Sequence, residues 1–195
     1  MPTMTLLPDG LAVSGWNANT GTVNSALTTN NGDTTYAEAG TNGETCTLTF
    51  AAPSVAESGI SSITSVQFLS AGRFPARGVG GTNVDFLFQV GTALPGLSET
   101  INYPNSFAHS VRNGTVRTVN TAGGAWSYSN LEGVKIKISK NGASSPDVRI
   151  TMINLLVTYV AVTGYGNLVS GIASANIGKI NGIATANIGK VNGVD

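Results

Sequence analysis

The longest apolar stretch lies near the end of the first 162 residues and reads Val148-Arg149-Ile150-Thr151-Met152-Ile153-Asn154-Leu155-Leu156-Val157-Thr158-Tyr159. Apolar residues alternate along it, which is typical of a β-strand. The alternation changes phase, because Val148, Ile150 and Met152 share one parity and the apolar residues from 153 to 159 favour the other. Both sets can face one core only if the strand contains an extra residue. We therefore predict a β-bulge at residues 151–152.

The same two-residue alternation marks residues 44–50, 84–90 and 134–140. In each segment, apolar residues on one face oppose mostly polar residues on the other, as in a strand with one wet face. Residues 63–70 and 23–27 are weaker strand candidates. The pattern predicts that the inward side chains of the first and third segments are Cys46, Leu48, Phe50, Val134, Ile136 and Ile138.

Turn signals separate these segments. Pro8-Asp9-Gly10 and the Asn-Gly pairs at 31–32, 42–43, 113–114 and 141–142 favour turns. Only residues 126–133 favour a short helical turn, with Trp126 and Leu131 closing one end of a core. About eight short strands with turn-rich connections predict an all-β fold, an antiparallel β-sandwich or jelly roll over residues 1–162.

Composition narrows the classes of function. Only 10% of the 195 residues are charged, and ten basic residues balance ten acidic ones, so no electrostatic attraction to nucleic acid or an anionic membrane is expected. No run of 18 apolar residues suggests a membrane span. One cysteine and one histidine argue against a disulfide, a zinc cluster or another cofactor. The first residues lack the pattern of a signal peptide, so we expect synthesis in a reducing cytoplasm.

Residues 163–195 form a tail of different character, in which an eleven-residue unit occurs twice. Residues 172–182 read IASANIGKING and residues 183–193 read IATANIGKVNG, so nine of eleven positions are identical. An eleven-residue period is compatible with a right-handed coiled coil. Two glycines in each unit, costing about 1 kcal/mol apiece in a helix, argue against that interpretation. We expect short extended segments separated by Asn-Gly turns.

Such segments cannot bury their isoleucines alone, because an isolated strand pair is marginal in water. Repeats of this kind become stable by stacking on neighbours, which we expect other chains to supply. The alternative is a tail that folds back on its own sandwich. Lys179 and Lys190 either pair with carboxylates of neighbouring chains or keep strand edges soluble. The predicted assembly interface comprises Ile172, Ile177, Lys179, Ile180, Asn181, Gly182, Ile183, Ile188, Lys190, Val191, Asn192 and Gly193.

The tail resembles the Ala-x-Ile-x-Lys-Ile/Val-Asn-Gly-Val repeats at the ends of tailed-bacteriophage structural proteins, found in capsid decorations and tail appendages. The sandwich is similar to a β-domain of such proteins in residues 7–10, Gly15-Trp16, residues 33–36, Trp126 with Leu131 and Val134, and the strand at 148–159. The resemblance implies a non-enzymatic virion component, commonly a homotrimer, on the exterior of the particle. It implies a second virion protein as partner, such as the major capsid protein or a tail protein, and leaves head or tail placement open.

No motif in the sequence predicts catalysis, and the acidic residues are scattered rather than paired along one strand. Cys46 is expected to be buried and inert, and His109 to lie in a polar loop. Calcium binding would need clustered acids, which are missing. The alternative to a structural role is a carbohydrate-binding adhesin or receptor-binding module of a tail fibre, with a loop site built around Trp16 or Tyr36 that stacks on a host surface glycan. Trp126 is expected in the core instead.

Overall fold

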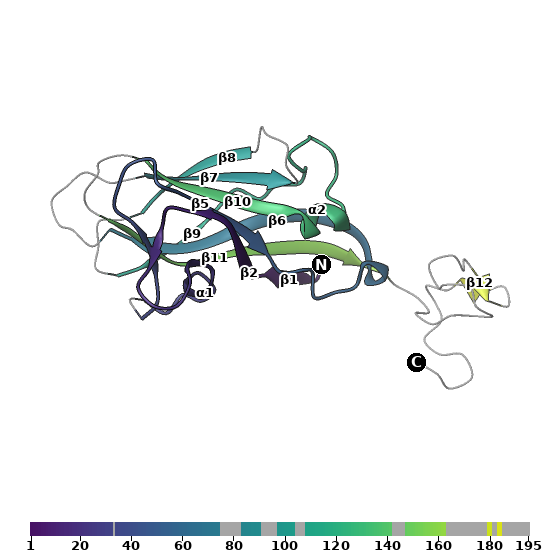
Figure 1. Ribbon diagram of the computed structural model, residues 1–195. Helices are drawn as coiled ribbons and strands as arrows, with labels where there is room; N and C mark the ends of the chain where they lie inside the picture. Colours follow the sequence, from purple (N-terminus) through teal and green to yellow (C-terminus); the bar gives the residue numbers. More distant parts are fainter. Residues whose placement is uncertain are drawn as a thin grey trace.

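The structure is a computed structural model that describes residues 1–32, 34–74, 83–90, 97–103, 108–141, 147–162, 179–180 and 183–184. Two antiparallel β-sheets are stacked face to face with the hydrophobic core between them (Figure 1). The predicted all-β sandwich is therefore confirmed.

The first sheet is built around its longest strands, β6 (Ile60–Arg73) and β11 (Val148–Ala161). Its strand order is β3-β4-β11-β6-β9, and β1 also pairs with β11. Because β4 pairs with residues 148–150 and β1 with residues 155–158, two short strands share one side of β11. The remaining strands are β1 (Thr3–Leu6), β3 (Asn17–Ala18), β4 (Ala37–Ala39) and β9 (Ser110–Asn113).

The second sheet has the order β2-β5-β10-β7-β8, with β10 at its centre. Consecutive strands β1 and β2 belong to different sheets, so the chain crosses between the layers at Leu7. The strands of this sheet are β2 (Pro8–Ser14), β5 (Thr45–Phe50), β7 (Asn83–Val90), β8 (Leu97–Asn102) and β10 (Val134–Asn141).

The bulge expected in the longest apolar stretch is present. Ile150 pairs with Gly72 and Met152 pairs with Ala71, which leaves Thr151 as the extra residue of β11. Thr151 is fully buried, whereas Met152 is only half-buried. The phase therefore changes at Thr151, and the expectation that Met152 shares the inward face with Ile150 is wrong.

The alternation in β5 and β10 follows the prediction. All six side chains expected to face inward are at most 5% exposed, and the threonines and lysines between them are half-buried. The predicted segments 63–70 and 84–90 lie within β6 and β7. Two-residue alternation with one wet face therefore located these strands correctly.

Residues 23–27 depart from the strand prediction. They contain the short helix α1 (Val23–Ala26), which buries Val23, Ala26 and Leu27. The helix begins because the Thr22 hydroxyl accepts a hydrogen bond from the Ser25 backbone N–H, while the Ser25 hydroxyl accepts one from Thr22 N–H. This reciprocal cap outweighs the local β-propensity.

The turn predictions have mixed outcomes. Gly32 and Gly43 have positive φ angles of 67° and 83°, as expected of Asn-Gly turns. Pro8-Asp9-Gly10 instead belongs to β2, whose pairing with β5 is irregular between Pro8 and Gly10. In the pair at 113–114, Asn113 is the last residue of β9 and Gly114 is buried against Phe68. The pair at 141–142 extends outside the described residues.

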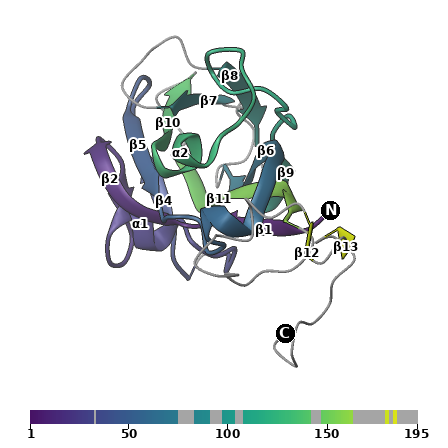
Figure 2. The same cartoon turned by 90° about the vertical axis from the view of Figure 1, so that its right-hand side faces the viewer.

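The short helix α2 (Tyr128–Glu132) lies where helical character was predicted. Trp126 is 4% exposed and Leu131 is fully buried, so both close the core at one end of the sandwich. Figure 2 views the molecule from this end and shows α2 between the two sheets.

Candidate functional site

The same end of the sandwich leads to the C-terminal repeats. After β11, the Val162 backbone N–H donates to the Gly59 carbonyl at 3.0 Å. Near the end of the strand, Tyr159 N–H donates to the Pro2 carbonyl at 3.1 Å. Gly59 closes a short 3-10 helix, Glu57–Gly59, that precedes β6. The last described residue of the sandwich is thus anchored beside residues 57–59.

A hollow of about 200 Å³ lies next to this anchor. Its apolar lining comes from the buried side chains of Ile63 and Trp126 and the half-buried Ile60. Its polar lining is exposed except for the half-buried Tyr128, and it consists of Glu57, Ser61, Ser62, Ser127 and Tyr128. The hollow therefore combines an apolar base with hydroxyl groups and one carboxylate.

The segment before α2 holds one wall of the hollow in place. The Trp126 indole N–H donates to the Arg117 carbonyl at 3.0 Å. Ser127 caps α2 by accepting a hydrogen bond from Asn130 N–H, and the Asn130 side chain accepts from Ser127 N–H at 3.0 Å. Asn120 donates to that same side-chain oxygen. These bonds fix Ser127 and Tyr128 at the start of the helix.

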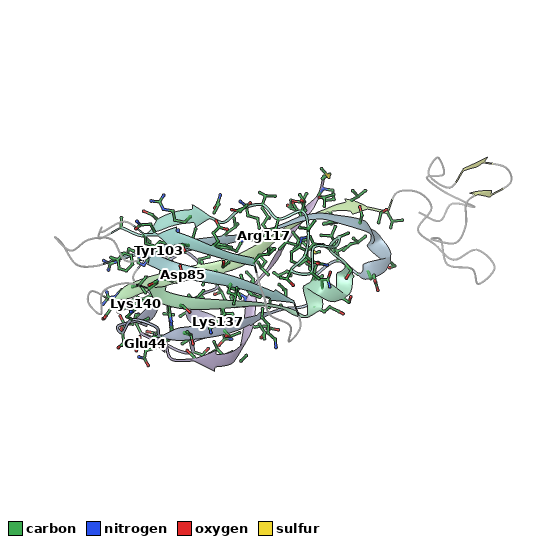
Figure 3. The ribbon with its side chains drawn as sticks, turned by 90° about the horizontal axis from the view of Figure 1, so that it is seen from above. Glu44, Asp85, Tyr103, Arg117, Lys137 and Lys140 are labelled. Carbon is green, nitrogen blue, oxygen red and sulfur yellow. The ribbon has the colours of Figure 1, made fainter. Side chains whose placement is uncertain are left out.

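Arg117, whose carbonyl accepts the hydrogen bond from Trp126, is itself held by a contact with β8 of the second sheet. Its guanidinium lies 3.3 Å from the Glu99 carboxylate of β8, and both side chains are largely buried. Glu99 also accepts hydrogen bonds from Thr115 N–H. In Figure 3 Arg117 is labelled on the opposite side of the molecule from Glu44 and Lys140. The contacts of Glu99 with Thr115 and Arg117 therefore connect β8, an edge strand of the second sheet, to the segment that follows β9, an edge strand of the first sheet. This connection lies near the hollow.

In the repeat region, the structure describes two short strands, β12 (Lys179–Ile180) and β13 (Ile183–Ala184). They pair antiparallel, with Ile180 opposite Ile183 and Lys179 opposite Ala184. The described part of the repeat is thus extended, and the Asn-Gly pair between the two strands lies outside the described residues. The other predicted interface residues lie outside the described residues: Ile172, Ile177, Asn181, Gly182, Ile188, Lys190, Val191, Asn192 and Gly193.

The structure places Trp16 and Tyr36, the two predicted glycan-binding residues, in different environments. Trp16 is 3% exposed, and its indole N–H donates to the Glu44 carbonyl at 3.1 Å, so its ring belongs to the core. Tyr36 is half-buried, and the Arg149 guanidinium carbon lies 4.4 Å from its ring centre. Arg149 also contacts the Glu38 carboxylate at 3.2 Å. The prediction that Trp16 stacks on a glycan is therefore wrong, whereas the one for the half-buried Tyr36 stays a prediction.

Lys140 is a buried cation that no pattern in the sequence indicated. It follows Ile138 on the inward face of β10, is 1% exposed, and its Nζ donates to the Gly40 carbonyl at 2.5 Å. Burial lowers the pKa of Lys140, while the carboxylates of Asp147 and Glu44 oppose this change. Glu44 in turn accepts hydrogen bonds from Gly40 N–H and Thr41 N–H. The arrangement fastens residues 40–44 to β10.

Cys46, His109 and the acidic residues do not come together as a metal site in the described part of the chain. Among those residues, no group of three or more His, Cys, Asp or Glu side chains could hold a metal ion. Cys46 is fully buried, as predicted. His109 lies in a loop and is half-buried. None of the described helices is long and apolar enough to cross a membrane.

The thiol of Cys46 gives a prediction about alkaline stability. Burial raises its pKa from 9.0 to about 11, with a smaller opposing effect from Ser14. Because the unfolded thiol ionises first, stability present below pH 9 should fall by about 2–3 kcal/mol as the pH rises to 11. Urea unfolding of the wild type and Cys46→Val at pH 8 and pH 11 measures this.

The comparison between the two proteins isolates the thiol. Lys140 acts in the opposite direction, since a lowered folded pKa makes stability rise with pH, but it is present in both proteins. The wild type should lose more stability than Cys46→Val between the two pH values. Equal losses would mean that the thiol ionises as readily in the folded protein as in the unfolded chain.

Comparison with known proteins finds distant likenesses to solved structures. No family model matches the sequence, and no curated protein matches it. A structure of TmCBM61 in complex with β-1,4-galactotriose aligns with a TM-score of 0.41 and 10% identity, covering 79% of this chain and 87% of that chain. The Agl-KA catalytic domain aligns with a TM-score of 0.39 and 14% identity, covering 87% of this chain and 30% of that chain.

Proposed function

We propose that this chain is a non-enzymatic structural protein of a tailed-bacteriophage virion, which decorates or cements the capsid or forms a head or tail appendage. It assembles with copies of itself, as a homotrimer, through the repeats of residues 163–195. Its second partner is another virion protein, such as the major capsid protein or a tail protein. It is made in the host cytoplasm and displayed on the exterior of the particle.

The observation that carries this proposal is the repeated unit at residues 172–193. Its described part is an antiparallel pair of only two residues per strand, with an isoleucine on each strand at the junction. A pair of that size is not stable in water without further contacts. Apolar burial contributes roughly 25 cal/mol per Å², so a few isoleucines in each of three chains favour association substantially. Neighbouring chains supply the contacts that one tail lacks.

Full-length protein and a variant with Ile180→Asp and Val191→Asp test the proposal. These residues occupy equivalent positions in the two units, so each unit acquires one charge in its apolar segment. Light scattering should give three times the chain mass of 19.8 kDa for the wild type and the single-chain mass for the variant. Burying an unpaired carboxylate in the interface would cost too much for assembly to persist.

The repeat supplies its own control. Ser174 and Thr185 are equivalent, so Thr185→Ser introduces a residue that the first unit already contains and should leave the mass unchanged. A monomeric wild type, or a variant with both aspartates that still assembles, would contradict the proposal. Replacing Lys179 and Lys190 with glutamine distinguishes their two roles, because loss of the trimer indicates ion pairs and precipitation indicates edge protection.

The alternative function, a carbohydrate-binding adhesin or receptor-binding module of a tail fibre, cannot use Trp16 as a surface platform. In the described residues, the hollow bounded by Glu57 and Tyr128 offers that function a different location. The two functions are compatible, because the hollow and the repeats are separate parts of the chain.

A further inference from the structure

We propose that the hollow at residues 57–63 and 126–128 binds a single ring of a neutral saccharide. This inference goes beyond the assembly function and does not depend on it. A sugar ring presents apolar C–H groups on its faces and hydroxyl groups around its rim. The hollow presents the matching chemistry, with apolar side chains at its base and hydroxyls and a carboxylate at its exposed lining.

The polar groups that recognise the hydroxyls are available. The Glu57 carboxylate and the Tyr128 phenol make no hydrogen bond or ion pair with other residues that the structure describes. A carboxylate accepts strong, charge-assisted hydrogen bonds from hydroxyl donors. The half-buried Tyr128 adds an aromatic ring with a polar tip, a combination suited to contact with both parts of a sugar.

The size of the hollow favours one ring over a long chain. Its volume of about 200 Å³ is smaller than the roughly 300–1,000 Å³ typical of pockets for drug-sized ligands. The terminal unit of a surface glycan fits such a space while the rest of the glycan stays in solvent. The bonds that hold Trp126 and Ser127 also mean that little ordering is needed on binding.

Other ligand classes match the lining less well. None of the described residues lining the hollow is lysine or arginine, so a phosphate or sialic acid would meet only the negative charge of Glu57. One carboxylate is too few for a metal ion that needs several oxygen ligands. A purely apolar ligand would leave Glu57 and the serines without partners. A neutral polyhydroxylated ring satisfies both the apolar and the polar groups.

The test uses the full-length protein on a printed array of neutral and sialylated glycans. Galactose, glucose and N-acetylglucosamine are then titrated individually by saturation-transfer NMR. The wild type should bind one or more neutral glycans and bind sialylated versions at least tenfold more weakly. Tyr128→Ala and Glu57→Gln should each weaken binding of the neutral sugar at least tenfold.

Matched controls separate binding from folding and assembly. Glu132→Gln changes an exposed carboxylate on α2 that does not line the hollow, so it should not alter sugar affinity. Melting temperature and light scattering of every variant should match the wild type, which keeps this result independent of trimer formation.

Two outcomes would overturn the saccharide site. One is a wild type that binds no neutral glycan, or whose binding is unchanged in both Tyr128→Ala and Glu57→Gln. The other is tight binding of a synthetic peptide of residues 172–182 that Glu57→Gln abolishes, because the hollow would then hold a lysine of the repeat.

Discussion

Replacing Trp16 with alanine is expected to lower the free energy of unfolding by about 3–5 kcal/mol, the usual cost of truncating a large buried aromatic side chain. The ring is 3% exposed, and its indole N–H bonds to the Glu44 carbonyl, which would keep only its second hydrogen bond, from Lys140 N–H. Urea unfolding at pH 7 measures the loss. Because Trp16 lies in the core, its replacement should lower stability and should not remove a sugar-binding surface.

Tyr36→Ala is the matched control, because it removes an aromatic ring that is only half-buried. Tyr36→Ala should lower the free energy of unfolding by about 1 kcal/mol, because it removes the contact between the ring and the Arg149 guanidinium. If Trp16→Ala proved as mild as Tyr36→Ala, the indole could not lie in the core. Trp16 would then again be a candidate for a sugar-binding surface.

The strands that could be predicted from the sequence have one wet face. In β5 and β10, threonines and lysines alternate with buried apolar residues, so the period of two is visible without knowledge of the partner strands. The bulge in β11 was detectable for a related reason, since the apolar pattern changes phase. Pattern alone could not show that Thr151 is the extra residue. Its hydroxyl tolerates burial because it bonds to Asn30.

Features that depend on distant contacts could not be predicted in the same way. Trp16 is buried in the core, where its indole N–H bonds to the carbonyl of Glu44, 28 residues further along the chain. Residues 23–27 have strand-like composition, but the reciprocal hydrogen bonds of Thr22 and Ser25 begin a helix there. A Thr or Ser three residues before another small polar residue is the local signal that would have indicated it.

The hollow could not be predicted from the sequence, because two separate segments form it. Glu57 and the serines of β6 lie more than 60 residues before Tyr128, and only the fold brings them together. The sequence did indicate that Trp126 closes one end of the core. The sequence did not indicate that Trp126 also forms the base of the hollow, because the hollow depends on which side chains surround Trp126 in the fold.

Replacing Gly114 with alanine is expected to destabilise the sandwich by about 3 kcal/mol, the upper part of the usual range for overpacking. A Cβ atom at Gly114 would lie 2.2 Å from Cε1 of Phe68, inside the contact distance of two carbon atoms. Phe68 is fully buried in β6, so its ring cannot move away without disturbing the core. Gly114 N–H also bonds to the Phe68 carbonyl, which holds the two residues together.

Gly124→Ala provides a comparison at a glycine ten residues further along. Among the described residues, the nearest atom that a Cβ there would meet is Nδ2 of Asn120 at 3.6 Å, so the melting temperature of this variant should stay within a few degrees of the wild type. A double variant tests the cause, because Phe68→Leu removes the ring that the new methyl group would strike. Gly114→Ala should therefore cost less in the Phe68→Leu background than alone. Equal costs in both backgrounds would show that the ring is not what excludes a side chain at residue 114.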